Sequence, residues 1–228
     1  MTALEELDDL VRNGLVSDIF RMERAYRLLF GIGEQSATLN GGNFGELFGA
    51  VQNALELEAV LATARLYDKP NRRYPTRCLR QVLDFLEQRA TELPQVVEAY
   101  NTKHALELIT TDADVLASVD AGTTDFVAKL VPLYRGILDS QDVTEKVEKL
   151  KAIRDKRMAH NEAATPAGPT WASLETLILH AQHLVGVIGW AFFSRVYVHN
   201  GRYFLSDDAE RPSRAIVRLA RRLNANGT

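Results

Sequence analysis

Apolar residues recur at intervals of three and four positions along almost the whole of this sequence, whereas the alternation typical of β-strands is scarce. That spacing places the apolar side chains on one face of an α-helix. The chain has 228 residues, 46% of them hydrophobic and 25% charged, which is the composition of a globular protein large enough to bury a core. The sequence therefore predicts an all-α fold and excludes disorder as the dominant state.

Glycine, proline and capping residues set the limits of the predicted helices. The expected helices are 3–30, 44–67, 75–90, two or three helices between 94 and 139, a basic helix 143–160, an apolar helix 170–196 capped by Thr170, and a basic helix 211–223. Gly31 and Gly33 are expected to cap the first helix, Gly33–Gly42 to form a polar connection, and Pro75 to open the third helix.

One segment near the C-terminus predicts strands instead of a helix. Apolar and aromatic residues flank the pair Asn200-Gly201 within 196–205, which favours a small β-hairpin with a two-residue turn. We expect a helical domain over 1–195, with the hairpin and basic C-terminal helix of 196–228 packed on it. On the last helix, Ile216, Leu219, Ala220 and Leu223 are predicted to face inward.

Several features bear on the cellular compartment. Cys78 is the only cysteine, so no intrachain disulfide can form. The first residues carry four acids where a secretory signal would need basic residues and an apolar run. The longest apolar stretch, Leu184–Phe193, is about half of what a bilayer span requires, and is better explained as a buried helix segment. A cytoplasmic protein without a membrane association is the expectation.

The formal charge of -3 hides two basic segments. Residues 146–157 contain six lysines and arginines against two acids, and residues 211–222 contain five arginines and no acid. Local basic patches of this kind can bind a polyanion even though the net charge of the chain is negative. The candidate contacts to RNA phosphates are Lys151, Lys156, Arg157, Arg214, Arg218 and Arg221, although a solvated helix face is the simpler explanation of the last three.

The end of the basic helix carries the residues most suggestive of chemistry. At 100° per residue, Arg154 falls in the middle of the apolar stripe that Val143, Val147, Leu150 and Met158 define. An unpaired guanidinium there would cost several kcal/mol, so Arg154 must meet a carboxylate, carbonyl groups, a second subunit or an anionic ligand. His160 lies about 120° around the helix, so the two side chains converge only if the helix frays or two copies of the helix cross.

An arginine and a histidine on one anion can cleave a phosphodiester. The neutral His160 imidazole would take the proton from a ribose 2′-hydroxyl, which attacks the adjacent phosphorus, while Arg154 stabilises the charge that develops on the phosphoryl oxygens. Lys156 and Arg157 would help to keep the imidazole neutral, and Asp155 would orient the pair. This chemistry needs no metal ion and no cofactor.

The sequence here resembles the HEPN superfamily, and within it the AbiU-type branch linked to abortive phage infection. The resemblance rests on Arg27–Gly31, Phe44–Gly49, Ala64–Lys69, Leu79–Leu83 and Ile153–His160, and covers about 20–190. It implies a helical bundle, a homodimer with a composite site, and a metal-independent endoribonuclease in which Arg154 and His160 are catalytic and Asp155 follows the arginine. RNA is the implied substrate, and a protein antitoxin or operon partner is an expected partner. In one subset of the superfamily a tyrosine stands where this chain has Ala164, so regulation through that tyrosine is not expected.

Other interpretations stay open at this point. A catalytically silent HEPN module could bind RNA, a nucleotide or a protein through the same basic surface, or Arg154 and His160 could only brace an interface. His180 and His183 have helical spacing, but no third ligand accompanies them, so hydrogen-bonded histidines in a packed helix are favoured over a metal site. Gly31, Gly33, Gly41 and Gly42 lack the pattern of a phosphate-binding loop.

Overall fold

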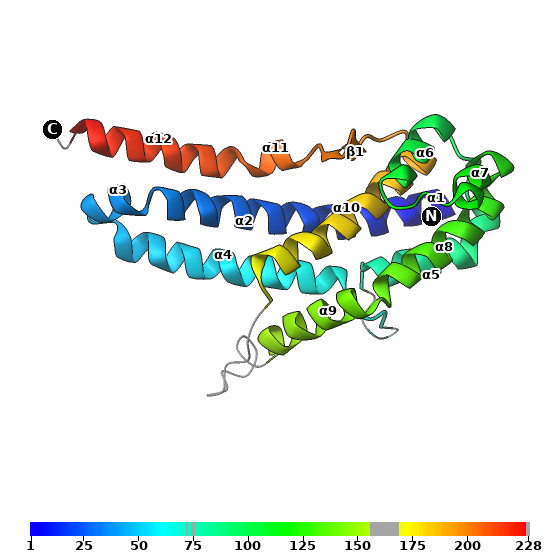
Figure 1. Cartoon of the computed structure of the whole chain (residues 1–228), viewed down its shortest axis with the longest axis horizontal. Helices are drawn as coiled ribbons and strands as arrows, with labels where there is room; N and C mark the ends of the chain where they lie inside the picture. Colours follow the sequence, from blue (N-terminus) through cyan, green and yellow to red (C-terminus); the bar gives the residue numbers. More distant parts are fainter. Residues whose placement is uncertain (72, 74–75, 156–168, 227–228) are drawn as a thin grey trace. The chain divides into compact units, whose positions relative to one another are not determined.

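A computed structural model describes residues 1–71, 73, 76–155 and 169–226. These residues are mostly helical, with one two-stranded hairpin, which confirms the all-α prediction (Figure 1). The chain divides into two compact units, one made of Met1–Ile19 and Thr63–Phe204, the other of Phe20–Ala62 and Leu205–Thr228. The boundary expected at residue 195 stays a prediction.

The first unit holds most of the elements. They are α1 (Ala3–Asp8), the π-helical segment η1 (Asp9–Val16), the start of α2 (Ser17–Glu34), the end of α4 (Gly45–Leu66), α5 (Leu79–Arg89), the short 3₁₀-helix η2 (Ala90–Glu92), α6 (Ala99–Glu107), α7 (Ala113–Ala121), α8 (Thr123–Leu138), α9 (Gln141–Ile153), α10 (Trp171–Phe193), β1 (Val198–His199) and β2 (Arg202–Tyr203). The three helices α6, α7 and α8 confirm the two or three expected between 94 and 139. The helix expected from Pro75 begins at Leu79, after Cys78 as its N-cap, and Pro75 itself lies outside the described residues.

Helix α10 is the centre of this unit. It is capped as predicted by the Thr170 hydroxyl, which accepts a hydrogen bond from the Ser173 N–H. Most of its side chains are buried, and it packs against η1, α6 and α9. Among the described residues it is the one helix long and apolar enough to cross a bilayer, but two thirds of its most apolar window is buried within the protein (67%). Its apolar character is therefore explained by its place in the core.

The hairpin packs on α10 through two glycines of that helix. Val198 pairs with Tyr203 and His199 with Arg202, and Asn200 and Gly201 have the positive φ angles (49° and 71°) of the predicted two-residue turn. A Cβ atom on Gly186 would lie 2.9 Å from Val198, and one on Gly189 would lie 2.6 Å from Tyr197. The absence of a side chain at these two positions lets the hairpin contact the helix backbone.

The second unit comprises the rest of α2 and α4, with α3 (Ser36–Gly41), α11 (Ser206–Ala209) and α12 (Arg211–Asn226). The glycine cap predicted at Gly31 and Gly33 is wrong, because α2 continues to Glu34. A Cβ atom on Gly31 would lie 2.2 Å from the Ser213 hydroxyl, so this glycine allows α2 and α12 to approach closely. The predicted polar connection to Gly42 mostly forms α3.

The other predicted features of these helices are partly corrected. The expected first helix is interrupted by the π-helical turns of η1, and α4 and α12 match the predicted 44–67 and 211–223 closely. On α12, Ala220 is buried as predicted, whereas Leu219 is 36% exposed and is not a core residue.

Two histidines of α10 give a prediction for the dependence of stability on pH. Burial lowers the pKa of His180 and of His183. For His180, the charge of Asp142 in α9 opposes this effect and the charge of Lys146 adds to it. Below about pH 6.5 the unfolded chain therefore binds more protons than the folded one, so the free energy of unfolding should fall as the pH drops from about 7.5 to 5.5.

Chemical denaturation at the two pH values measures this loss. The variant His183→Asn should show a smaller loss than the unmodified protein. Equal losses in the two proteins would contradict the role given to this half-buried histidine.

Candidate functional site

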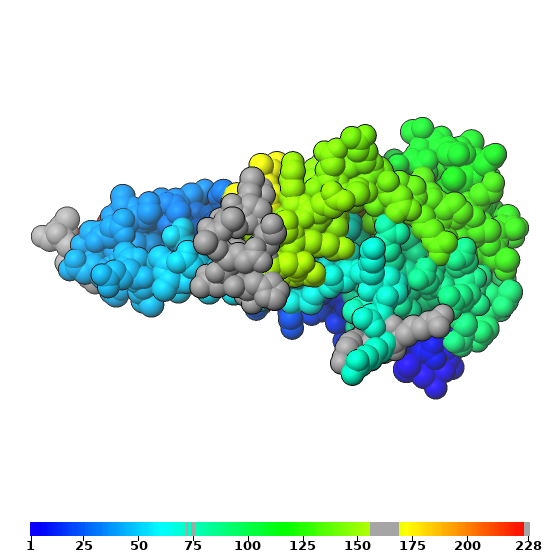
Figure 2. Space-filling model, turned by 90° about the horizontal axis from the view of Figure 1, so that it is seen from below, coloured from blue at the N-terminus to red at the C-terminus, as the bar shows by residue number. Residues whose placement is uncertain are grey.

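The candidate site lies where the basic helix α9 ends. Leu150 and Ile153 are buried and fix this end of the helix, and the chain keeps a helical form through Arg154 and Asp155. Figure 2 shows α9, in yellow-green, on the surface of the molecule. The residues 156–160, over which the sequence predicts that the helix continues, lie outside the described residues.

Arg154 is held between two carboxylates. Its Nη1 donates to Asp68 Oδ1 at 2.8 Å, and its Nε donates to Asp155 Oδ1 at 2.8 Å. The pKa of the guanidinium is raised, first by the hydrogen bond to Asp155 and then by Asp68. The sequence left a carboxylate, carbonyl groups, a second subunit or an anionic ligand open as partners of Arg154. The structure shows a carboxylate. The side chains of Arg154 and Asp68 each remain 28% exposed, so solvent or a ligand reaches the pair.

The end of α4 places Asp68 against α9. The neighbouring Tyr67 is buried, and its hydroxyl donates to the backbone oxygen of Leu177 in α10 at 2.7 Å. Arg65 forms an ion pair with the buried carboxylate of Asp18 at 2.8 Å. Because both anchors lie within three residues of Asp68, its carboxylate has a fixed position, and through it so does the Arg154 guanidinium.

Further cations lie near this ion pair. Burial lowers the pKa of the Lys151 ammonium, and the nearby charges of Arg154, Lys69 and Arg80 lower it further, while Asp68 opposes them. Arg80 also pairs with Asp139 at 2.5 Å. We call Lys69, Arg80, Lys151 and Arg154 the basic cluster. A group of like charges on a partly buried surface favours an anion that can contact several of them at once.

The structure places only some of the predicted site residues. Lys151, Arg154 and Asp155 lie together at the end of α9, whereas Lys156, Arg157 and His160 lie outside the described residues. Arg214, Arg218 and Arg221 belong to α12, in the other unit. Whether Arg154 and His160 meet stays a prediction.

Sequence reasoning did not single out Asp68, Lys69 and Arg80 as site residues. Asp68 and Lys69 directly follow the predicted helix 44–67, and Arg80 falls within the predicted helix 75–90. Asp68 and Arg154 are separated by 86 positions, and no local pattern links them. The one signal was that Asp68, Lys69 and Arg80 fall in the segments that carry the family resemblance.

A second basic surface runs along α12. Arg211, Arg214, Arg218, Arg221 and Arg222 are exposed, and at 100° per residue they lie within an arc of about 100°. Arg211 pairs with Asp208, and Arg214 donates to the backbone oxygen of Asp207. Among the described residues, no carboxylate pairs with Arg218, Arg221 or Arg222. We call these five residues the arginine face.

No group of three histidine, cysteine or acidic side chains suited to a metal ion occurs within the described parts of the chain. His180 and His183 are half-buried side chains of α10, and burial lowers their pKa values. They are therefore packed histidines of the core helix.

The helical fold, with a basic helix that ends at Arg154 and a histidine six residues further along the sequence, fits the HEPN class that the sequence resembles. The family HEPN_AbiU2, described as AbiU2, matches residues 4–216, and the chain belongs to this family. The match includes the basic cluster, His160 and the first part of α12. Comparison with curated proteins and with solved structures found no match.

Proposed function

We propose that this AbiU2-type HEPN protein is a metal-independent endoribonuclease that acts in defence against phage. The observation that carries the proposal is the position of Arg154, whose guanidinium is held by hydrogen bonds to Asp68 and Asp155 at 2.8 Å each, with Lys151 three residues before it in the basic helix α9. A phosphate that entered the basic cluster would meet a guanidinium already oriented for two hydrogen bonds. The family membership supports a role in abortive infection.

The proposed reaction uses residues of the chain alone. His160 takes the proton from a ribose 2′-hydroxyl, and the oxygen attacks the adjacent phosphorus. Arg154 stabilises the negative charge on the phosphoryl oxygens as the bond to the 5′ oxygen breaks, and that oxygen takes up a proton. The products are a 2′,3′-cyclic phosphate and a 5′-hydroxyl.

Each of the two basic surfaces would contact RNA phosphates. Lys69, Arg80 and Lys151 would contact phosphates next to the scissile one, and the arginine face of α12 would bind the backbone without reading its sequence. Binding should therefore weaken steeply with salt. Replacing both Arg218 and Arg221 by glutamine should reduce the slope of log affinity against log salt by about two.

Incubation of the protein with a mixed RNA pool in EDTA tests the reaction. Cleavage is expected, with cyclic phosphate and 5′-hydroxyl ends. A substrate with 2′-deoxyribose at the scissile position should resist. Cleavage of that substrate, or a need for a metal ion, would overturn the mechanism.

A catalytically silent module is the second candidate, and one observation favours it. Two carboxylates already neutralise Arg154, which is the arrangement expected of a purely structural arginine. Salt-sensitive binding of RNA without any cleavage would select this function. If neither binding nor cleavage occurs and Arg154→Ala only lowers stability, the arginine serves to brace the fold.

A variant at Asp68 distinguishes between these candidate functions. Asp68→Asn keeps the shape of the side chain but removes the charge that opposes Arg154. In a nuclease, RNA should bind more tightly, since the cluster gains positive charge, and kcat should fall about 10-fold or more because the guanidinium is less well oriented. Steady-state kinetics measures both constants. Asp139→Asn, which removes the exposed partner of Arg80, is the control for the change in net charge.

A further inference from the structure

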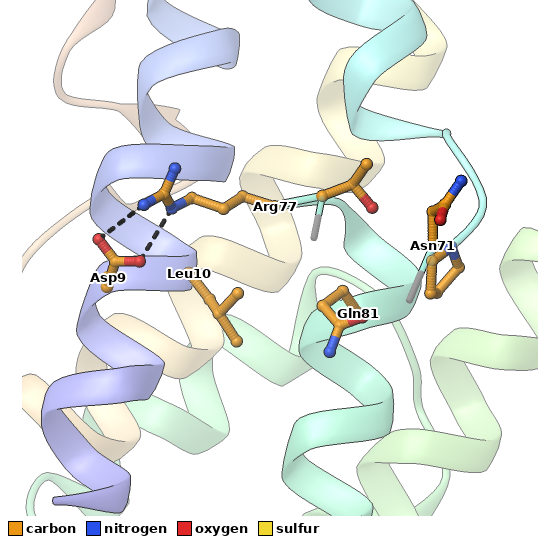
Figure 3. A pocket seen from close by; sticks show the side chains of 7 residues that line it. Asp9, Leu10, Asn71, Arg77 and Gln81 are labelled. Carbon is orange, nitrogen blue, oxygen red and sulfur yellow. Dashed lines mark hydrogen bonds and ion pairs between the residues drawn. The ribbon is translucent and has the colours of Figure 1, made fainter. Parts of the chain in front are cut away.

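An open pocket of about 490 Å³ lies in the first unit, between η1, the α4–α5 connection and α5 (Figure 3). This volume is within the range of small-molecule sites in proteins. The pocket is distinct from the Arg154 ion pair, and none of its lining residues was singled out by the sequence as a site residue.

One wall of the pocket is a fixed guanidinium. The Arg77 side chain extends to Asp9 on η1 and donates to its two carboxylate oxygens at 2.9 and 3.2 Å. Asn13 also donates to Asp9 at 2.8 Å. Hydrogen bonds from Arg77 and Asn13 lower the pKa of the Asp9 carboxyl, in that order. The carboxylate thus stays charged and holds the planar guanidinium in one orientation.

The backbone of η1 is shaped for this contact. A Cβ atom on Gly14 would lie 2.3 Å from the Cβ of Arg77, so only glycine lets Arg77 pass so close to the helix. The segment is also π-helical, a form that occurs often at functional sites.

The other walls combine apolar surface with amides. Leu10 and Pro70 supply apolar contacts, and Gln81 supplies an amide group, while the Asn71 Oδ1 accepts a hydrogen bond from the Arg73 N–H at 2.9 Å (Figure 3). A planar, aromatic ring with hydrogen-bonding edges matches this combination, because guanidinium planes stack on nucleobases and amides bond to their edges.

Two residues that line the pocket lie close in the sequence to residues of the Arg154 site. Asn71 follows Asp68 by three residues, so their Cα atoms are separated by at most about 11 Å. Gln81 directly follows Arg80, whose charge acts on Lys151. These neighbours in the sequence link the walls of the pocket to the residues around Arg154.

We propose that this pocket binds one nucleobase of single-stranded RNA beside the scissile phosphate, and so determines the sequence preference of cleavage. The proposal rests on the proposed function for its link to cleavage, whereas the binding of a nucleobase can be measured without any reaction.

The first experiment measures binding by the inactivated protein. Fluorescence anisotropy of labelled single-stranded RNA and competition by the four nucleoside monophosphates are followed in the His160→Ala background. Adding Gln81→Ala, or Leu10→Trp to fill the pocket, should weaken binding about 5- to 150-fold, the range found for one base. Gln88→Ala, an exposed glutamine two turns further along α5, is the matched control and should leave binding unchanged.

The second experiment maps the ends of the cleavage products by sequencing. The unmodified protein and Gln88→Ala should share one base preference beside the cut, and Gln81→Ala should lose it while still cleaving. Cleavage with no preference, or with a preference that Gln81→Ala and Leu10→Trp retain, overturns the proposal. Binding of RNA or nucleotides that depends on Gln81, in a protein that never cleaves, would refute the nuclease function and leave the pocket assignment standing. Binding that depends on neither Gln81 nor Leu10 refutes the pocket assignment.

Discussion

His160→Ala and Arg154→Ala are each expected to lower the rate of RNA cleavage about 100- to 1,000-fold or more. The first removes the base that accepts the 2′-hydroxyl proton, and the second removes the group that stabilises the phosphoryl charge. Rates are measured on one RNA of defined sequence at saturating enzyme. Circular dichroism checks that both variants keep the helical content of the unmodified protein.

Mixing these two variants tests whether the site is shared between two copies of the chain. If Arg154 of one protomer works with His160 of the other, a mixed dimer contains one intact site, and an equal mixture should recover about a quarter of the original rate. If both residues act within one chain, each site lacks one group and no activity returns. A monomer in solution, shown by light scattering, would contradict a shared site directly.

Gly189→Ala is expected to reduce the free energy of unfolding by about 1–3 kcal/mol. The new Cβ atom would lie 2.7 Å from the backbone oxygen of Arg195 and 2.6 Å from the Tyr197 ring. A ring can turn aside, but a backbone oxygen moves only with its chain, so the hairpin must separate from α10. Urea denaturation measures the loss.

Gly136→Ala is the matched control for this prediction. Gly136 also lies inside a helix, α8, but nothing lies within 4 Å of the position of its Cβ atom. Here the substitution should raise stability by about 0.5–1 kcal/mol, because alanine loses less backbone entropy in a helix. A loss of stability in both variants would show that the close contact at Gly189 is not the cause.

The sequence predicted the elements that local interactions control. Thr170 begins α10 because a hydroxyl accepts a hydrogen bond three residues away, and Asn200-Gly201 forms the hairpin turn because both residues accept positive φ. The spacing of apolar residues also located α4 and α12, because this spacing involves only residues within one or two helical turns of each other. Gly31 was misread, because its function is a contact with Ser213, far away in the sequence.

The sequence by itself determined the fold class, most helix limits and the basic character of α9 and α12. Only the tertiary structure decided that Arg154 pairs with Asp68, that Lys69 and Arg80 join Lys151 beside it, and that Arg77 reaches Asp9 to form a pocket wall. These contacts join positions 86 and 68 residues apart. Propensity and periodicity act over a few residues, whereas the pairing of distant charges depends on how whole helices pack.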